Sequence, residues 1–318
     1  MTMHDNKSLF GSESAQFIDI IDQLALAKSK SKYSFMAADD YDRALREDSD
    51  IGMQVYWNEI IARAHLTAVV AILRSRHWIS AVVAATNDSN LLAFAAALRG
   101  LIESSADTQS ALGGIAISLA ENHVNIIQAL SGKLVNQCFV SKEIEDALIH
   151  FKYARHLTRA EMEIAPKTHK ALQVRQYLEG LEKGQVHKVT ACYQSLCDLT
   201  HPGASSVWMW IASENGVDLE LNPHQDESAI AFYLTEYRET FPELLMFAFN
   251  PAVLALNVLN YFPLKKFHTP NLLDWNLSGI PLWQKCQTKL GEYLPIARKD
   301  KGLRLVKSNP AVHTDAAR

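Results

Sequence analysis

The chain has 318 residues, of which 48% are hydrophobic and 21% are charged, so one large domain or two smaller ones can bury a sizeable core. A formal net charge of −4 argues against bulk electrostatic binding of nucleic acid. The four cysteines form no C-x-x-C pair, so neither a zinc site nor a disulfide framework is indicated. We therefore expect a cytoplasmic protein that holds no metal and no other cofactor.

Residues 1–50 are expected to form an N-terminal extension with one short helix. Residues 1 to about 12 show no structural signal and are expected to be disordered. From Ser14 to Ala27 apolar residues recur at helical spacing, which predicts an amphipathic helix. No basic region followed by an apolar run opens the chain, so we expect no signal peptide.

Residues 51–203 are predicted to be a helical bundle. Asn87 to Asn90 supply cap residues for a central helix over Asn90 to Ser110, and Gly113-Gly114 ends that helix. The other predicted helices are Tyr56 to His77, continued or restarted by Trp78 to Ala85, then Ile115 to Leu130, Ser141 to His156, Thr168 to Glu182 and Gln185 to His201.

Residues 204–297 are predicted to hold a small β-hairpin near 205–221 and a C-terminal helical layer. Ser205 to Ala212 favours a β-strand, and Val217 to Leu221 alternates in polarity. Asn215-Gly216 between them is a strong hairpin-turn signal.

Three further helices are expected after the hairpin, before a flexible, polar and basic tail over 298–318. They are Asp226 to Thr240, Pro242 towards Tyr261, and a short one within Trp275 to Leu294.

The most apolar stretch runs from Leu244 to Phe262. It contains Asn250, Pro251 and two further asparagines, which a lipid-spanning helix seldom carries. This composition favours a buried core helix, and we expect no membrane partner.

Two polar motifs stand out within the predicted bundle. Arg99 and Glu103 lie four residues apart among small apolar residues of the central helix, so they are neighbours on a buried face. Tyr193, Cys197 and His201 recur at the same spacing near the end of a later helix.

If the two helices pack together, Arg99, Glu103, Tyr193 and His201 share one pocket. His201 then acts as a general acid or base, and Arg99 and His201 bind a phosphate or carboxylate. The simpler interpretation is structural: Arg99 pairs with Glu103, and Tyr193 and His201 cap backbone carbonyls, so the four residues brace the bundle.

Common enzyme motifs are absent from the chain. It contains no Walker loop, no G-x-G-x-x-G after a strand, no H-E-x-x-H and no G-x-S-x-G. Asp146 and His150 have metal-ligand spacing, but no third ligand lies near them in the sequence, and no metal site is predicted.

The two polar motifs carry a family resemblance. Leu98 to Glu103 reads L-R-x-L-x-E and Tyr193 to Pro202 reads Y-x-x-L-[SC]-x-x-x-H-P, a combination that resembles an uncharacterised bacterial family of helical proteins. The similarity covers roughly Trp57 to Gly203 and implies a fold class and a shared pocket, without a substrate. A more distant similarity is to the HEPN helical ribonucleases of toxin and antiviral systems. Their signature is an Arg and, four to six residues later on the same helix, a His, and no Arg of this chain is followed by a His at that separation.

Two functions are therefore expected. The first is a cytoplasmic bacterial binding or assembly module that uses the Arg99, Glu103, Tyr193 and His201 pocket structurally or for a small anionic ligand. In this case a ribbon carrying Trp208 and Trp210 either forms a homo-oligomer or packs against the bundle of its own chain. The alternative is a metal-independent, RNA-cleaving effector of a stress or antiviral defence system, with Arg99 and His201 meeting from different helices.

Overall fold

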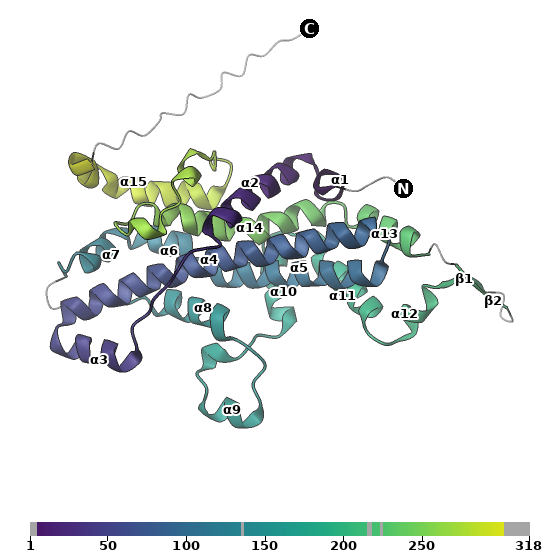
Figure 1. The fold of residues 1–318 in the computed structure, drawn as a ribbon, viewed down its shortest axis with the longest axis horizontal. Helices are drawn as coiled ribbons and strands as arrows, with labels where there is room; N and C mark the ends of the chain where they lie inside the picture. The colour runs from purple at the N-terminus through teal and green to yellow at the C-terminus, as the bar shows by residue number, and fades with distance from the viewer. Residues whose placement is uncertain (1–4, 135–136, 215–217, 223–224, 302–318) are drawn as a thin grey trace, which may run out of the picture.

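The computed structural model describes residues 5–134, 137–214, 218–222 and 225–301. These residues form a mainly α-helical bundle with one small two-stranded sheet among them, which confirms the predicted fold class (Figure 1). The α-helices are α1 (Asn6–Phe10), α2 (Ser12–Lys28), α3 (Ala38–Glu47), α4 (Ser49–Asn87), α5 (Leu91–Leu112), α6 (Ile115–Glu121), α7 (His123–Leu130), α8 (Lys142–Tyr153), α9 (Arg159–Ile164), α10 (Val174–Lys183), α11 (Val189–Thr200), α12 (Ala204–Trp208), α13 (Gln225–Glu236), α14 (Thr240–Leu259) and α15 (Pro281–Lys301). The strands are β1 (Ile211–Glu214) and β2 (Leu219–Leu221), and the 3₁₀ turns are η1 (Lys167–His169), η2 (Lys265–Phe267) and η3 (Pro270–Asp274).

Helices α4, α5 and α14 pack against one another and form the centre of the bundle (Figure 1). Helix α4 runs unbroken over 39 residues, so Trp78 to Ala85 continues the preceding helix and does not restart it. The carboxylate of Asp48 caps its first turn by accepting the Asp50 amide at 2.8 Å. The long helix thus provides a continuous apolar surface for the other two central helices.

Helix α5 begins where the cap signal predicts, because the Asn90 side chain accepts the Ala93 amide at 3.0 Å. Its Gly100 lies against the indole of Trp78 on α4, where a Cβ atom would come within 2.7 Å of the ring. Only glycine therefore fits this position without displacing Trp78, and α4 and α5 pack closely there.

Two of the central helices, α4 and α14, are long and apolar enough to cross a membrane. Within the fold, 44% of the most apolar window of α4 and 72% of that of α14 are buried. Buried core helices of globular proteins have the same length and composition, so the two helices are weak evidence for a membrane span.

The described part of the N-terminal region, residues 5–50, differs from the prediction, since three helices precede α4 instead of one and the first of them starts at Asn6. Helix α1 is held by a reciprocal capping box between Asp5 and Ser8, with bonds of 2.9 Å. Phe10 is fully buried and meets Phe241 of α14 edge-on, with ring centroids 6.2 Å apart. The expectation of disorder is therefore wrong for residues 5–12, because one buried aromatic residue anchors a helix too short to show a periodic pattern. Residues 1–4 lie outside the described part of the chain.

The predicted hairpin is present, but its first strand is shorter than expected. Val207 and Trp208 lie in helix α12, and β1 starts only at Ile211. The strands pair antiparallel, with Ile211 opposite Leu221 and a register irregularity near Ser213. The predicted Asn215-Gly216 turn lies outside the described residues. Trp208 therefore sits on a helix, and Trp210 precedes the strand, so the expected ribbon carrying both tryptophans is wrong.

We call residues 203–214 and 218–222 the arm, because α12, β1 and β2 extend together from one end of the bundle (Figure 1). A second projection, the α9 loop of residues 154–173, leaves the bundle between α8 and α10 (Figure 1). The predicted helix ends at His156 and Thr168 both fall within this loop. At the C-terminus α15 continues to Lys301, past the expected start of the tail, and residues 302–318 lie outside the described part.

Candidate functional site at the α5–α11 interface

The two motif helices are in contact, and three of the predicted site residues meet there. The Tyr193 hydroxyl of α11 donates a 2.6 Å hydrogen bond to Oε1 of Glu103 on α5. One turn earlier on α5, Nη1 of Arg99 donates to Oγ1 of Thr200 at 2.9 Å. Two bonds thus connect the helices, about two turns apart along α11.

The ion pair within this cluster is loose. Nε and Nη2 of Arg99 both lie 3.4 Å from Oε1 of Glu103, and the guanidinium carbon lies 5.5 Å from the centroid of the Tyr193 ring. The side chains of Arg99 and Glu103 are 27% and 41% exposed, so water screens the pair. Such a pair contributes about 0–1 kcal/mol to folding, and the Tyr193 bond to the carboxylate is the stronger element.

Tyr193 remains a hydrogen-bond donor at neutral pH. Burial raises the pKa of its phenol above the ordinary value, and the bond to Glu103 and the charge of that carboxylate raise it further. A phenol held protonated in this way is unsuited to act as a base. The Tyr193–Glu103 bond therefore fits a bracing role.

His201 is not among the hydrogen-bond partners of this cluster within the described residues. Helix α11 ends at Thr200, and His201 adopts an extended conformation (φ −92°, ψ 145°) with its side chain exposed. The following Pro202 disfavours the helical conformation at position 201, which is consistent with the end of α11 at Thr200. The residue that Arg99 contacts is Thr200, which the pattern of Tyr193, Cys197 and His201 did not single out.

A cavity of about 560 Å³ lies beside Tyr193, between α10 and α11. Its lining residues are Val174, Arg175, Leu178, Glu179, Glu182, Thr190, Tyr193 and Gln194. Arg99, Glu103 and His201 do not line it, so the predicted anion-binding pair Arg99 and His201 does not face this space.

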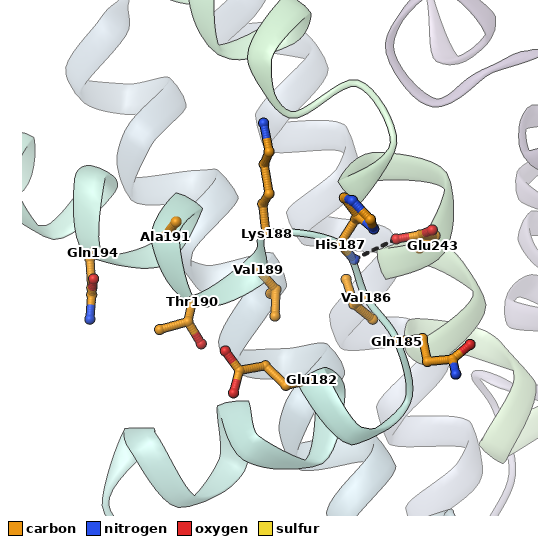
Figure 2. Close-up of a pocket in the computed structure, with 10 residues that line it drawn as sticks. All are labelled: Glu182, Gln185, Val186, His187, Lys188, Val189, Thr190, Ala191, Gln194 and Glu243. Atoms are coloured by element: carbon orange, nitrogen blue, oxygen red, sulfur yellow. Dashed lines mark hydrogen bonds between the residues drawn. The ribbon is translucent and has the colours of Figure 1, made fainter.

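A larger, open pocket of about 860 Å³ adjoins it at the start of α11 (Figure 2). Two non-glycine residues that line this pocket, Gln185 and Lys188, have left-handed φ values of 69° and 50°. Each such backbone conformation costs of order 1 kcal/mol of folding free energy. The loop is held in this shape because the His187 amide donates to Glu243 at 2.6 Å and Thr240 donates to the His187 carbonyl at 2.6 Å.

Two charged side chains of this larger pocket already have partners. Lys188 bonds to Glu236 at 2.7 Å, and Glu243 accepts the His187 amide, as the dashed line in Figure 2 shows. These two bonds connect the α10–α11 loop and the start of α11 to α14 and α13.

No cluster of three or more His, Cys, Asp or Glu side chains suited to a metal occurs among the residues that the structure describes. The two side chains with metal-ligand spacing are engaged elsewhere. Asp146 accepts from Lys142 at 2.9 Å, and the two ring nitrogens of His150 lie 2.9 Å from the Thr168 carbonyl and 2.7 Å from the Tyr177 hydroxyl.

The arm is a second candidate site, and it begins directly after α11. Its apolar side chains are unusually accessible: Leu221 is 73% exposed, Val207 59%, Leu219 58% and Trp208 46%. Exposed apolar groups gathered on one projection are typical of a surface that contacts another molecule.

The chain matches no family model, no curated protein and no solved structure in comparisons with each. The resemblance to a bacterial helical family and the distant similarity to HEPN ribonucleases therefore stay predictions. Function has to be inferred from the geometry.

Proposed function

We propose that this protein is a cytoplasmic binding or assembly module, and that the arm contacts a second copy of the chain. The observation that carries this proposal is the exposure of Val207, Trp208, Leu219 and Leu221 on the arm. Exposed apolar side chains gain about 25 cal/mol for each Å² that a partner covers. All four cysteines are unpaired, which supports the cytoplasmic location.

The strand pair of the arm also favours a partner. Two strands of three and four residues are marginal in water without further strands or a covering element. The three residues of β2 are all exposed, so their side chains are accessible to a partner.

The Arg99 cluster supports this function from inside the bundle. Arg99 holds Thr200, the last residue of α11, and the arm starts three residues later. The bond from Tyr193 to Glu103 fixes the same helix two turns earlier. The cluster thus fixes the end of α11 and, with it, the direction in which the arm leaves the bundle. In this proposal the Arg99, Glu103 and Tyr193 side chains have a structural role.

A small anionic ligand fits the cluster less well. Such a ligand would compete with Glu103 and Thr200 for the guanidinium of Arg99, which already donates to both.

Sedimentation velocity over a range of concentrations tests the proposal. Wild-type protein should self-associate, and Leu221→Ser or Trp208→Ser should weaken association at least about tenfold, as loss of an interface anchor does. Leu26→Ser is the matched control, since Leu26 is 66% exposed on α2, away from the arm. A monomeric wild-type protein, or arm variants that associate like the control, would contradict the proposal.

The alternative function is a metal-independent ribonuclease-like effector of a stress or defence system. The observation in its favour is that Arg99 contacts Thr200, the immediate neighbour of His201. Expression should then slow host growth, and His201→Ala should relieve that toxicity. Toxicity that persists in His201→Ala, or an absence of toxicity and of RNA cleavage by the wild-type protein, counts against this alternative.

A further inference from the structure

The cavity between α10 and α11 has an apolar floor. Leu178 of α10 and Tyr193 of α11 line it and are 4% and 9% exposed, and Val174 lines it and is 38% exposed. Its volume of about 560 Å³ falls within the range of roughly 300–1,000 Å³ that is typical of sites for small molecules. The cavity therefore offers a surface that can cover the apolar part of a small ligand.

Three polar residues line both this cavity and the larger pocket beside it: Glu182, Thr190 and Gln194. None of their side chains has a hydrogen-bond or ion-pair partner within the part of the chain that the structure describes. Figure 2 shows the Glu182 side chain reaching from α10 towards Thr190 at the start of α11. A ligand between the two helices therefore meets these side chains without displacing an existing bond.

The charges that line the two spaces favour a cation. Arg175 is compensated by Glu179, since its Nε lies 3.6 Å from Oε1 of that carboxylate. Lys188 is bonded to Glu236 at 2.7 Å. The carboxylate of Glu182 is left without a cation among the described residues, so a positively charged ligand pairs with it and an anion is repelled.

We propose that this cavity binds a small organic cation, a primary ammonium group on an apolar body of a few carbon atoms. The ammonium has three N–H donors, which match the carboxylate of Glu182 and the side-chain oxygens of Thr190 and Gln194. The apolar body covers Leu178 and Tyr193. The site is separate from the arm, so this inference does not depend on the proposed assembly function.

Both parts of the ligand are required for binding. Glu182 lies at the exposed rim of the cavity, where water screens its charge, so the ion pair alone binds weakly. The apolar floor adds affinity for the carbon chain, but it has no preference for the ammonium over another head group. The geometry therefore predicts selectivity for a molecule that carries a positive charge and an alkyl chain together.

Isothermal titration calorimetry of the full chain at neutral pH tests this selectivity with a set of matched probes. n-Hexylamine should bind saturably at one site. n-Hexanol, which lacks the charge, and ammonium chloride, which lacks the chain, should each bind at least about fivefold more weakly. Hexanoate, with the opposite charge, should not bind. Hexanoate that binds as well as hexylamine, or no saturable binding of hexylamine, would overturn the proposal.

Variants at the rim locate the site. Glu182→Gln should weaken hexylamine binding at least about fivefold, and Glu182→Lys should abolish it, because the new ammonium repels the ligand. The matched control is Glu47→Gln, since Glu47 is an exposed carboxylate of α3 that lines neither space. Circular dichroism should show an unchanged helical spectrum for all three variants, because both positions are exposed. If both Glu182 variants bind hexylamine as the control does, the cavity is not the site and the inference fails.

Discussion

Two tryptophans show how differently the bundle and the arm use the same side chain. Trp57 of α4 is fully buried, donates its indole N–H to the Phe139 carbonyl at 2.8 Å, and stacks on the Phe139 ring with centroids 5.2 Å apart. Trp208 of the arm is 46% exposed. The comparison teaches that apolar residues of the bundle stabilise the fold, whereas those of the arm are available to a partner.

The largest expected effect comes from the buried tryptophan. Trp57→Ala leaves a cavity and removes the bond to Phe139, and should lower the free energy of unfolding by about 3–5 kcal/mol. Trp208→Ala, the matched exposed variant, should change it by less than about 0.5 kcal/mol. Urea denaturation followed by circular dichroism measures both values. Similar losses for the two variants would show that the arm is part of the folding core.

The next effect is a dependence of stability on pH that arises inside the bundle. His65 of α4 is fully buried, its Nδ1 lies 2.7 Å from the Tyr33 hydroxyl, and its Nε2 has no hydrogen-bond partner among the residues that the structure describes. Burial, together with the charge of Lys28, lowers the pKa of His65 to about 4. The folded protein thus keeps the ring neutral at pH values where the unfolded chain binds a proton.

The sign follows from that difference in bound protons. As pH falls from about 6.5 to about 4, the unfolded chain gains a proton that the folded protein does not, so stability should fall by up to about 1.4 kcal/mol per pH unit. Burial also lowers the pKa of His123, which adds a loss of the same sign. Denaturation midpoints of wild-type protein and His65→Gln across this range should show a shallower slope for the variant. Equal slopes for the two proteins would exclude His65 as a source of the loss of stability at low pH.

A smaller effect is expected at the junction between bundle and arm. Tyr193→Phe deletes the bond to Glu103, and should lower the free energy of unfolding by about 1 kcal/mol. Because α11 carries the arm, the same variant should also weaken self-association in sedimentation velocity. Normal association at an unchanged stability would mean that the cluster does not direct the arm.

The smallest effect on stability is expected on the arm itself. Leu221→Ser should leave the thermal midpoint within about 2 °C of wild-type protein, because its side chain is already 73% exposed. Differential scanning calorimetry at a concentration where the protein is monomeric measures this midpoint. A large fall in the midpoint would place Leu221 in an intramolecular contact.

The sequence was most informative where a regular pattern extends over several turns. The spacing of Arg99 and Glu103 on one helix and of Tyr193 on another predicted side chains that do meet, as the 2.6 Å Tyr193–Glu103 bond shows. Apolar periodicity and the Asn90 cap likewise located α5 to within two residues of its observed ends.

The pattern failed at chain ends and short elements, where tertiary contacts decide the conformation. Phe10 orders α1 by packing on Phe241, a partner more than two hundred residues away. Val207 and Trp208 favour a strand locally, yet they lie in a helix. Thr200 was missed as a partner of Arg99 because a hydroxyl next to a histidine and a proline carries no signal of its own.

Hydrogen–deuterium exchange at low and high protein concentration tests most directly whether the arm is an interface. At high concentration the amides of β1 and β2 should become protected, whereas those of α5, buried within one copy, should exchange at an unchanged rate. Exchange in the arm that stays fast and independent of concentration would contradict the proposed function.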